Sequence, residues 1–215
     1  MTDLNLWKRQ LGAVPDEVWE RTELETLVLA DNGLVEISPE LARLQRLRML
    51  DLGHNALARL PEAIGELVNL TDFLYLHDNR LSELPASIAK LTGLRYLNLS
   101  NNLFTALPDA VCELAALVEL RALDNQLSAL PDRIGRLTRL RELHLRNNAL
   151  ATLPASIGEL TALRQLDLRG NPLRTLPAAL LELPALEKLD LRWTPALEPP
   201  AWLAQLEARG ALVYR

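Results

Sequence analysis

The chain has 215 residues, of which 49% are hydrophobic, 24% charged and 4% aromatic, and its formal net charge at pH 7 is −5. The apolar content excludes an intrinsically disordered chain, and the acidic balance argues against general affinity for nucleic acid or anionic membranes. No apolar run approaches the ~18–20 residues needed to span a bilayer. Leucine alone supplies 54 residues, which suggests one packing problem solved many times.

The first 23 residues fit a weak version of a frame that the rest of the chain repeats. Trp19, set among charged residues between positions 16 and 23, predicts a polar, helix-like cover over one end of a repeat stack. Such a cover is needed because an uncapped solenoid exposes its leucines. The N-terminus shows no basic segment followed by an apolar run, so no secretory signal is expected.

From residue 24 onward the phrase L-x-x-L-x-L-x-x-N-x-L-x-x-L-P-x-x-I-x-x-L-x-x returns in phase. The steps are 23 residues long, except for one of 24 between Leu70 and Leu94. A shift of one residue would turn every later side chain of a strand to the other face. We therefore expect the extra residue to be absorbed near Thr71–Phe73 as a bulge. The repeats begin at Leu24, Leu47, Leu70, Leu94, Leu117, Leu140, Leu163 and Leu186.

Each repeat predicts one strand and one crossover. The alternation L-x-L, as at Leu27 and Leu29, has the period of a half-buried strand. The Pro-x-x-Ile segment, as in 154–157, suits a helical first turn on the opposite side. A recurring asparagine indicates buried amides that bond the turning backbone, with a ligand-binding ladder as the less favoured alternative. This column comprises Asn32, Asn55, Asn79, Asn102, Asn125, Asn148 and Asn171.

The end of the chain predicts a second cap. An amphipathic run from Ala201 to Ala208 precedes Gly210, which fits a helix C-cap, and residues 211–214 look like the opening strand of an unfinished repeat. We predict one domain over residues 1–215. It consists of a degenerate capping repeat at 1–23, seven repeats at 24–185, and a last repeat with its cap at 186–215. The two caps together predict a complete protein.

The repeated phrase resembles the leucine-rich repeat family, specifically its 23-residue Leu-Pro type, over essentially the whole chain. This type occurs in bacterial cytoplasmic proteins, in plant intracellular Ras-group proteins and in scaffolds of Ras signalling. The resemblance implies an α/β solenoid, a horseshoe with a parallel concave β-sheet and short helical or irregular convex segments. It also implies a non-catalytic, monomeric module that binds a protein or peptide. The alternative is a bacterial effector or signalling regulator that selects substrates for an enzyme supplied in trans.

Catalytic and metal motifs are scarce in this sequence. It contains no G-x-S-x-G, H-E-x-x-H, P-loop or C-x-x-C. The single cysteine, Cys112, favours a reducing compartment, hence the cytoplasm, and is interpreted as a small buried hydrophobe rather than a nucleophile. His54 and His77 fall in adjacent repeats, and Asp31 and Asp78 share the column of His54. Solvated or partner-contacting side chains are favoured over a metal site, and we expect no metal and no cofactor.

The residues between the strand leucines are expected to form the partner-binding face. The leucine columns are nearly constant along the chain, whereas these columns vary. A scaffold requirement would repeat, but a recognition surface must be specific. The predicted partner-binding residues are Met49, Phe73, Tyr75, His77, Tyr96, Arg121, Leu123, His144, Arg146, Arg169, Arg192 and Trp193.

Two groups in this set carry specific hypotheses. Aromatic residues at the middle of the array are read as an interaction hot spot, with mutual packing of the rings as a nearly equal alternative. An arginine row in the last repeats suits the carboxylates of an acidic protein partner. A solvated face balanced by Asp167, Asp190 and Glu142 is the favoured alternative for that row. The aromatic cluster comprises Phe73, Tyr75, His77 and Tyr96, and the arginine row comprises Arg146, Arg169 and Arg192.

Overall fold

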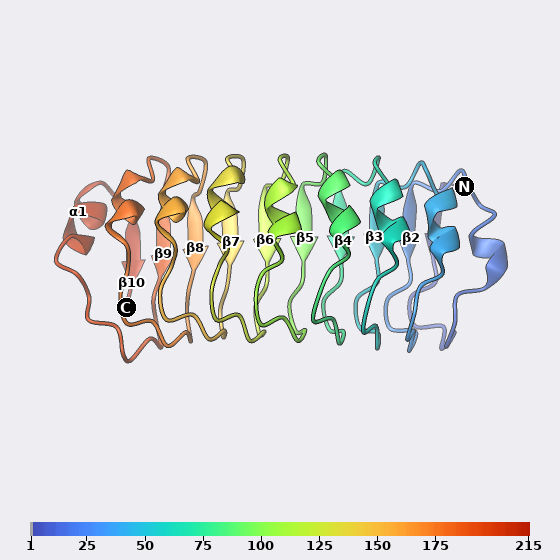
Figure 1. Ribbon diagram of the computed structural model, residues 1–215, viewed down its shortest axis with the longest axis horizontal. Coiled ribbons are helices and arrows are strands. Elements are labelled where there is room, and N and C mark those ends of the chain that lie inside the picture. Colours follow the sequence, from blue (N-terminus) through green and yellow to red (C-terminus); the bar gives the residue numbers. More distant parts are fainter. Residues whose placement is uncertain (1) are drawn as a thin grey trace.

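The structure, a computed structural model, describes residues 2–215 and has ten short strands in one parallel sheet (Figure 1). Every strand pairs with its neighbours in sequence order. Each repeat therefore adds one strand to a growing edge, as expected for an α/β solenoid. The strands are β1 (Asp3–Asn5), β2 (Thr26–Val28), β3 (Met49–Asp51), β4 (Phe73–Tyr75), β5 (Tyr96–Asn98), β6 (Glu119–Arg121), β7 (Glu142–His144), β8 (Gln165–Asp167), β9 (Lys188–Asp190) and β10 (Leu212–Tyr214).

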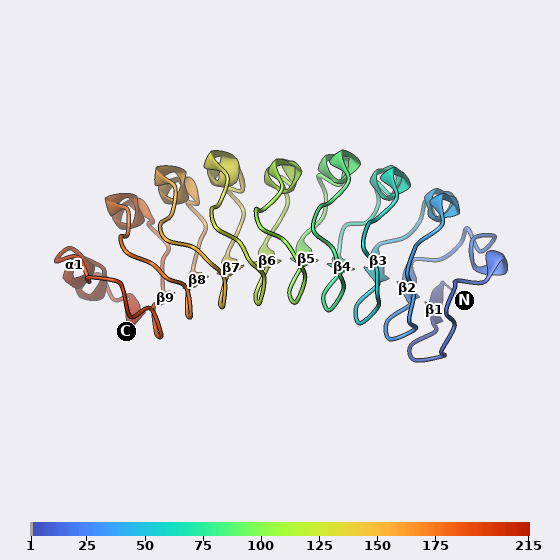
Figure 2. The same ribbon diagram turned by 60° about the horizontal axis from the view of Figure 1, so that its bottom comes forward.

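Short helical turns form the opposite layer. Figure 2 shows the strands along the inner side of an arc and these turns along its outer side. They are 3-10 helices, except for one α-helix near the C-terminus. They comprise η1 (Asp16–Val18), η2 (Pro39–Arg43), η3 (Glu62–Glu66), η4 (Ala86–Lys90), η5 (Asp109–Glu113), η6 (Asp132–Arg136), η7 (Ala155–Glu159), η8 (Ala178–Glu182) and α1 (Leu203–Ala208).

The repeated proline stands one position earlier than the sequence predicts. Pro154 precedes η7 with φ −68° and ψ 153°, so it is extended and outside the first turn. The same arrangement holds at Pro131 before η6, whereas Pro39 lies inside η2. Proline fixes φ near −65°, which suits extended backbone as well as a helix. In most repeats the proline is therefore the last residue of the loop before the 3-10 helix, and not the first residue of that helix.

The core is one continuous column of leucines between the two layers. The middle residue of every strand from β2 to β9 is a leucine that is at most 1% exposed. Strand pairing places Leu50, Leu74 and Leu97 side by side. Because each of these side chains packs against the repeats before and after it, no repeat buries its leucines alone. The residues flanking each central leucine are left on the concave face.

The asparagine column is structural, as favoured from the sequence. The Asn102 Nδ2 donates to the carbonyl oxygens of Leu76, Leu99 and Ser100 at 2.9, 3.0 and 3.2 Å. Its Oδ1 accepts the backbone amide of Leu81 at 2.9 Å. One side chain therefore ties together backbone of its own repeat and of the preceding one, and Asn102 is only 5% exposed. The asparagine side-chain amides form hydrogen bonds with backbone groups of the fold, so they are not available to bind a ligand.

The extra residue of the 24-residue repeat is absorbed where the sequence predicts. The amides of Asp72 and Phe73 both donate to the Arg48 carbonyl, at 3.0 and 3.4 Å, which is the regular pattern that Arg48 and Met49 make with Glu25. On the other side, the Arg95 amide donates to the Thr71 carbonyl at 3.0 Å. Thr71 and Asp72 thus stand opposite the single residue Arg95, just before β4 begins. The three residue pairs of β4 with each neighbour remain in register.

Buried side chains cover both ends of the leucine core. Trp19 follows η1 and is 2% exposed, so it covers the first leucines of the core. At the other end Leu203 and Leu206 of α1 are each 1% exposed, and Gly210 adopts the left-handed φ of 93° that a helix end requires. The last strand, β10, pairs in parallel with β9. Across residues 2–215, none of the helices has the length and apolar character needed to traverse a membrane.

Candidate functional site

Strand pairing determines which variable side chains meet on the concave face. Met49, Phe73 and Tyr96 occupy one column across β3, β4 and β5, and Tyr75 stands in the next column beside Asp51. Because residues two apart on a strand share a face, Phe73 and Tyr75 point the same way. The tight spacing of parallel strands therefore gathers the aromatic cluster at one place on the sheet.

The rings of the aromatic cluster are in mutual contact. Phe73 and Tyr75 stack with centroids 5.8 Å apart and an interplanar angle of 11°. Tyr96 lies 5.4 Å from Phe73 and 5.0 Å from Tyr75, tilted against both rings. His77 meets Tyr75 edge-on at 6.0 Å. These distances are in the range where aromatic pairs attract, so the cluster is a preformed surface and does not have to assemble when a partner arrives.

Mutual packing leaves part of the cluster open to solvent. Phe73 is 42% exposed, while Tyr75 and Tyr96 are half-buried. Burial raises the pKa of Tyr96 to about 12 and also raises the pKa of Tyr75, so both phenols are neutral at physiological pH. Mutual packing of the rings is thus observed, and the hot-spot interpretation stays a prediction. The rings fill the pleated surface, and Phe73 presents an apolar face with two phenol groups beside it.

A hollow of about 440 Å³ adjoins the aromatic cluster, where the chain enters β4 and β5. Phe73 and Tyr96 form its apolar side, and Arg48, Asp72, Arg95, Val118 and Glu119 complete its lining. Arg48 is paired with Asp72 at 3.1 Å, whereas Arg95 has no ion-pair partner among residues 2–215. The polar part of this group was not predicted from the sequence, because Arg48, Asp72 and Arg95 precede the variable columns between the strand leucines. The arginines at the second position of four repeats, Arg48, Arg95, Arg141 and Arg164, were the available signal.

The arginine row is largely paired within the chain. Arg169 donates to both carboxylate oxygens of Asp167 at 2.9 and 2.6 Å, and Arg192 donates to both oxygens of Asp190 at 2.9 and 2.7 Å. The Asp190 side chain is only 1% exposed. These bidentate pairs occupy the geometry that a partner's carboxylate would need. The structure therefore favours the balanced-face interpretation for Arg169 and Arg192.

Arg146, the remaining arginine of the row, and its neighbour Leu123 extend the face toward the centre. Arg146 pairs with Asp124 at 3.3 Å, so it too has an acidic partner within the chain. Leu123 is half-buried beside them. In the preceding core position Ala122 replaces the usual leucine and is 1% exposed. The predicted site residues in this stretch thus lie on the concave face, but they are less exposed than Phe73.

His144 belongs to a compact charged group with Arg121. Its Nε2 lies 3.1 Å from a Glu142 oxygen and 3.9 Å from a Glu119 oxygen. The Arg121 Nε lies 2.5 Å from the same Glu119 oxygen, and its guanidinium is 6.0 Å from the Tyr96 ring centroid. Glu142, which we expected to balance the arginine row, therefore contacts His144 instead. This group borders the aromatic cluster on its C-terminal side.

Trp193 is the most exposed aromatic residue of the predicted site, at 66%. Its φ of 60° is left-handed, which is an outlier for a bulky side chain and costs about 1–3 kcal/mol. The guanidinium groups of Arg169 and Arg192 each lie 5.9 Å from its ring. Trp193 thus stands apart from the aromatic cluster, at the far end of the face. In earlier repeats the same left-handed position holds Asp31, His54, Asp78, Asn101, Asp124, Asn147 and Gly170.

Cys112 is the buried hydrophobe that the sequence favours. It lies on η5, in the outer layer, with 1% exposure, and burial raises the pKa of its thiol to about 12. We expect the folded protein to resist alkylation by iodoacetamide at pH 8, because almost no thiolate is present. Mass spectrometry should show full modification only after denaturation. Rapid labelling of the folded protein would instead restore the nucleophile interpretation.

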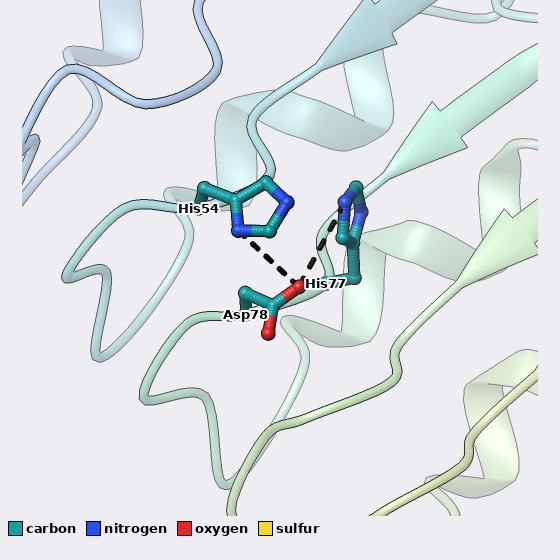
Figure 3. A group of neighbouring side chains, drawn as sticks. All are labelled: His54, His77 and Asp78. Atoms are coloured by element: carbon teal, nitrogen blue, oxygen red, sulfur yellow. Dashed lines mark ion pairs between the residues drawn. The ribbon is translucent and has the colours of Figure 1, made fainter.

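Two groups of side chains within residues 2–215 have the composition of a metal site. One is His54, His77 and Asp78, and the other is Glu119, Glu142 and His144. Figure 3 shows that His54 and His77 come from adjacent repeats and meet beside the carboxylate of Asp78. Asp31, which shares the column of His54 and Asp78, pairs instead with Lys8 at 3.5 Å. The sequence indicated the two histidines as neighbours but could not show which carboxylate they approach.

Comparison with protein families agrees with this geometry. The family model described as "Leucine rich repeat" matches residues 22–74, 123–173 and 138–195, and the one described as "Leucine-rich repeat region" matches residues 70–146. The chain belongs to the leucine-rich repeat family. In leucine-rich repeat proteins this fold is a general scaffold for protein interaction.

Solved structures show the same solenoid. A leucine-rich repeat protein of Leptospira interrogans is 28% identical, with a TM-score of 0.77 over 99% of this chain. The leucine-rich repeat domain of the type III effector XopL is 28% identical, with a TM-score of 0.83 over 99%. The ectodomain of the Arabidopsis thaliana receptor kinase GASSHO1, in complex with Casparian strip integrity factor 2, is 30% identical, with a TM-score of 0.64 over 100%. The chain spans 65%, 75% and 32% of these chains, respectively.

Proposed function

We propose that this leucine-rich repeat chain is a non-catalytic interaction module that binds a protein or peptide on its concave face, centred on the aromatic cluster. The observation that carries the proposal is the meeting of Phe73, Tyr75 and Tyr96 beside the hollow that Arg95 borders. Rigid aromatic anchors next to an unpaired guanidinium are the chemistry of binding hot spots. The cluster lies on the middle strands, where a curved face can contact a partner from both sides.

The same site indicates the chemistry of the partner. An apolar or aromatic side chain would pack on Phe73 and Tyr96, and a neighbouring carboxylate would pair with Arg95, which has no acidic partner among the described residues. The arginine row would contribute less, because Asp167 and Asp190 already occupy two of its guanidinium groups. We therefore propose a segment that combines an apolar anchor with one acid, and not a uniformly acidic partner.

The remaining parts of the proposal concern the cellular setting. The lone free and buried Cys112 supports a reducing, cytoplasmic location. The net charge of −5 argues against nucleic acid or anionic membrane as the partner. Caps that bury both ends of the leucine core, with Trp19 at one end and Leu206 at the other, support a monomer. A second candidate function, substrate selection for an enzyme supplied in trans, is supported by the likeness to the type III effector domain.

The double substitution of Tyr75→Ala and Tyr96→Ala tests the proposed site. Peptides are first selected from a random displayed library against the wild-type chain, and their affinity is then measured by fluorescence anisotropy. We expect the double variant to bind them at least about 30-fold more weakly, because the loss of one hot spot already costs about 2 kcal/mol or more. Arg95→Ala should weaken only those peptides that carry an acid.

A matched control uses an exposed apolar residue away from the concave face. Val68, which is 53% exposed beyond η3, is changed to alanine and should leave affinity unchanged. Circular dichroism checks that every variant is folded. If the selected peptides bind the double variant as tightly as the wild type, the aromatic cluster is not the binding site.

A further inference from the structure

We propose that His54, His77 and Asp78 form a binding site for one divalent transition-metal ion, with Zn²⁺ as the ion that their chemistry fits best. Two imidazoles and one carboxylate are a ligand set typical of zinc sites that keep their fourth position open. The His54 side chain is 56% exposed, so an ion has access and water has room to complete the shell. This inference goes beyond the proposed partner binding and does not depend on it.

The distances between the three groups are close to those of a coordinated ion. Ligand atoms about 2.0–2.1 Å from a tetrahedral ion stand about 3.4 Å from one another. The His54 Nδ1 lies 3.4 Å from an Asp78 carboxylate oxygen, and the His77 Nε2 lies 3.9 Å from the same oxygen. All three ligand atoms lie within 4.8 Å of one another (Figure 3). A small rotation of the His77 ring and the carboxylate therefore closes the site, without movement of the backbone.

The repeat backbone holds the three residues in place. The His54 amide donates to the His77 carbonyl at 2.9 Å, and the Asp78 amide donates to the Ser100 carbonyl at 2.9 Å. His54 and Asp78 occupy the same left-handed position of successive repeats, with φ of 52° and 53°. Their side chains thus leave equivalent points of the backbone one strand apart, so the ligands are preorganised by the sheet itself.

Asp78 differs from the other aspartates of its column. Asp31 is paired with Lys8 at 3.5 Å, and Asp124 is paired with Arg146 at 3.3 Å. Asp78 has no lysine or arginine partner within residues 2–215, and the groups paired with it there are the two histidines. An imidazole carries a charge only when it is protonated, whereas a bound dication would balance the carboxylate. This repeat therefore lacks the side-chain cation that its counterparts carry.

The packing of His77 holds its ring beside the other two ligands. Its side chain makes no hydrogen bond among the described residues, and the Nδ1 atom is buried without a partner. The atom that faces Asp78 is Nε2, so this nitrogen is the proposed ligand and has no competing hydrogen bond. The ring lies directly over Gly53, where a Cβ would come within 2.4 Å of the His77 Cε1.

The other candidate group provides a control within the same molecule. Glu119, Glu142 and His144 also lie close together, but Arg121 contacts a Glu119 oxygen at 2.5 Å. A guanidinium already supplies the positive charge there and occupies a ligand atom. Zinc should therefore bind at His54, His77 and Asp78 in preference to this group, and His144 serves as the matched histidine that does not participate.

The test is a calorimetric titration of ZnCl₂ into the full chain without a polyhistidine tag. We expect one ion per chain, and a loss of affinity of more than about 100-fold in His54→Gln and in Asp78→Asn, because each removes a direct ligand. His144→Gln should bind zinc as the wild type does. Zinc should also raise the thermal unfolding temperature of the wild type and of His144→Gln, but not that of His54→Gln.

Nuclear magnetic resonance of the imidazole nitrogens locates the ion directly. Zinc should shift the ring signals of His54 and His77 and leave those of His144 in place. Unchanged affinity in His54→Gln, or a zinc shift confined to His144, overturns the proposal. Because His54 is exposed and lies outside the aromatic cluster, its substitution leaves the proposed peptide site intact. Failure of the metal site is therefore distinguishable from failure of partner binding.

Discussion

Replacing Asn102 with alanine is expected to destabilise the protein by about 3–5 kcal/mol, because several buried backbone groups lose their partners at once and each costs about 1–3 kcal/mol. Three carbonyl oxygens lose the donor at Nδ2, and the Leu81 amide loses its acceptor. Urea unfolding followed by circular dichroism measures the loss. Since adjoining repeats share these bonds, the effect should extend over at least two repeats.

An exposed asparagine provides the comparison for this prediction. Asn69 donates one hydrogen bond to the Gln45 carbonyl at 2.8 Å on the surface. Asn69→Ala should change the free energy of unfolding by no more than about 0.5 kcal/mol, as is usual at the surface. Equal effects of the two substitutions would show that the buried amides do not hold neighbouring repeats together. The denaturant slope should stay unchanged if the array unfolds as one unit.

The second large effect is expected at Asp190. Its carboxylate is 1% exposed and accepts two bonds from Arg192, with Arg169 3.5 Å away. Asp190→Ala leaves both guanidinium groups without this acid, and the loss should exceed that of a fully exposed ion pair because the Asp190 carboxylate is buried. Glu187 pairs with Arg164 at the surface and is its control, because exposed pairs contribute at most about 1 kcal/mol. Chemical unfolding of Asp190→Ala and Glu187→Ala measures both.

The contribution of Asp190 should depend on pH. Burial opposes its ionisation, but the hydrogen bonds from Arg192 and the charge of Arg169 outweigh burial and hold the pKa of Asp190 below its ordinary value of 3.8. A lowered pKa stabilises the folded state above the unfolded value, and this stability is lost as pH falls through the folded value. The advantage of the wild type over Asp190→Ala should therefore be constant near neutrality and shrink below pH 3.8. An advantage that grows on acidification would contradict this assignment.

Substitution of Arg169 and Arg192 would separate residues that stabilise the concave face from residues that bind a partner there. If Arg169 and Arg192 serve mainly to neutralise Asp167 and Asp190, changing them should alter stability more than peptide affinity. The aromatic cluster should show the opposite balance, since Phe73 stays exposed while the rings around it pack together. Comparing the change in unfolding free energy with the change in peptide affinity for each variant therefore shows which residues stabilise the face and which bind the peptide.

The repeat frame and most of the fold are readable from the amino-acid sequence alone. The strand positions, the buried leucines and the asparagine column all follow from a spacing that recurs every 23 residues. Such features are local, because each depends on one repeat and on the identical packing of its neighbours. For the same reason the sequence located the extra residue near Thr71, since the pairing on either side of β4 had to stay in register.

How the variable side chains combine across repeats became visible only in the three-dimensional structure. Contacts such as those of Asp78 with His54, or of Arg146 with Asp124, join residues more than twenty positions apart. They depend on the direction each side chain takes from a curved sheet, and no single repeat encodes that direction. The hollow beside Arg95 and the separation of Trp193 from the aromatic cluster arise in the same way. The stacked strands set which residues share a column. Packing between columns then decides which charged side chains form ion pairs within the chain and which stay available to a partner.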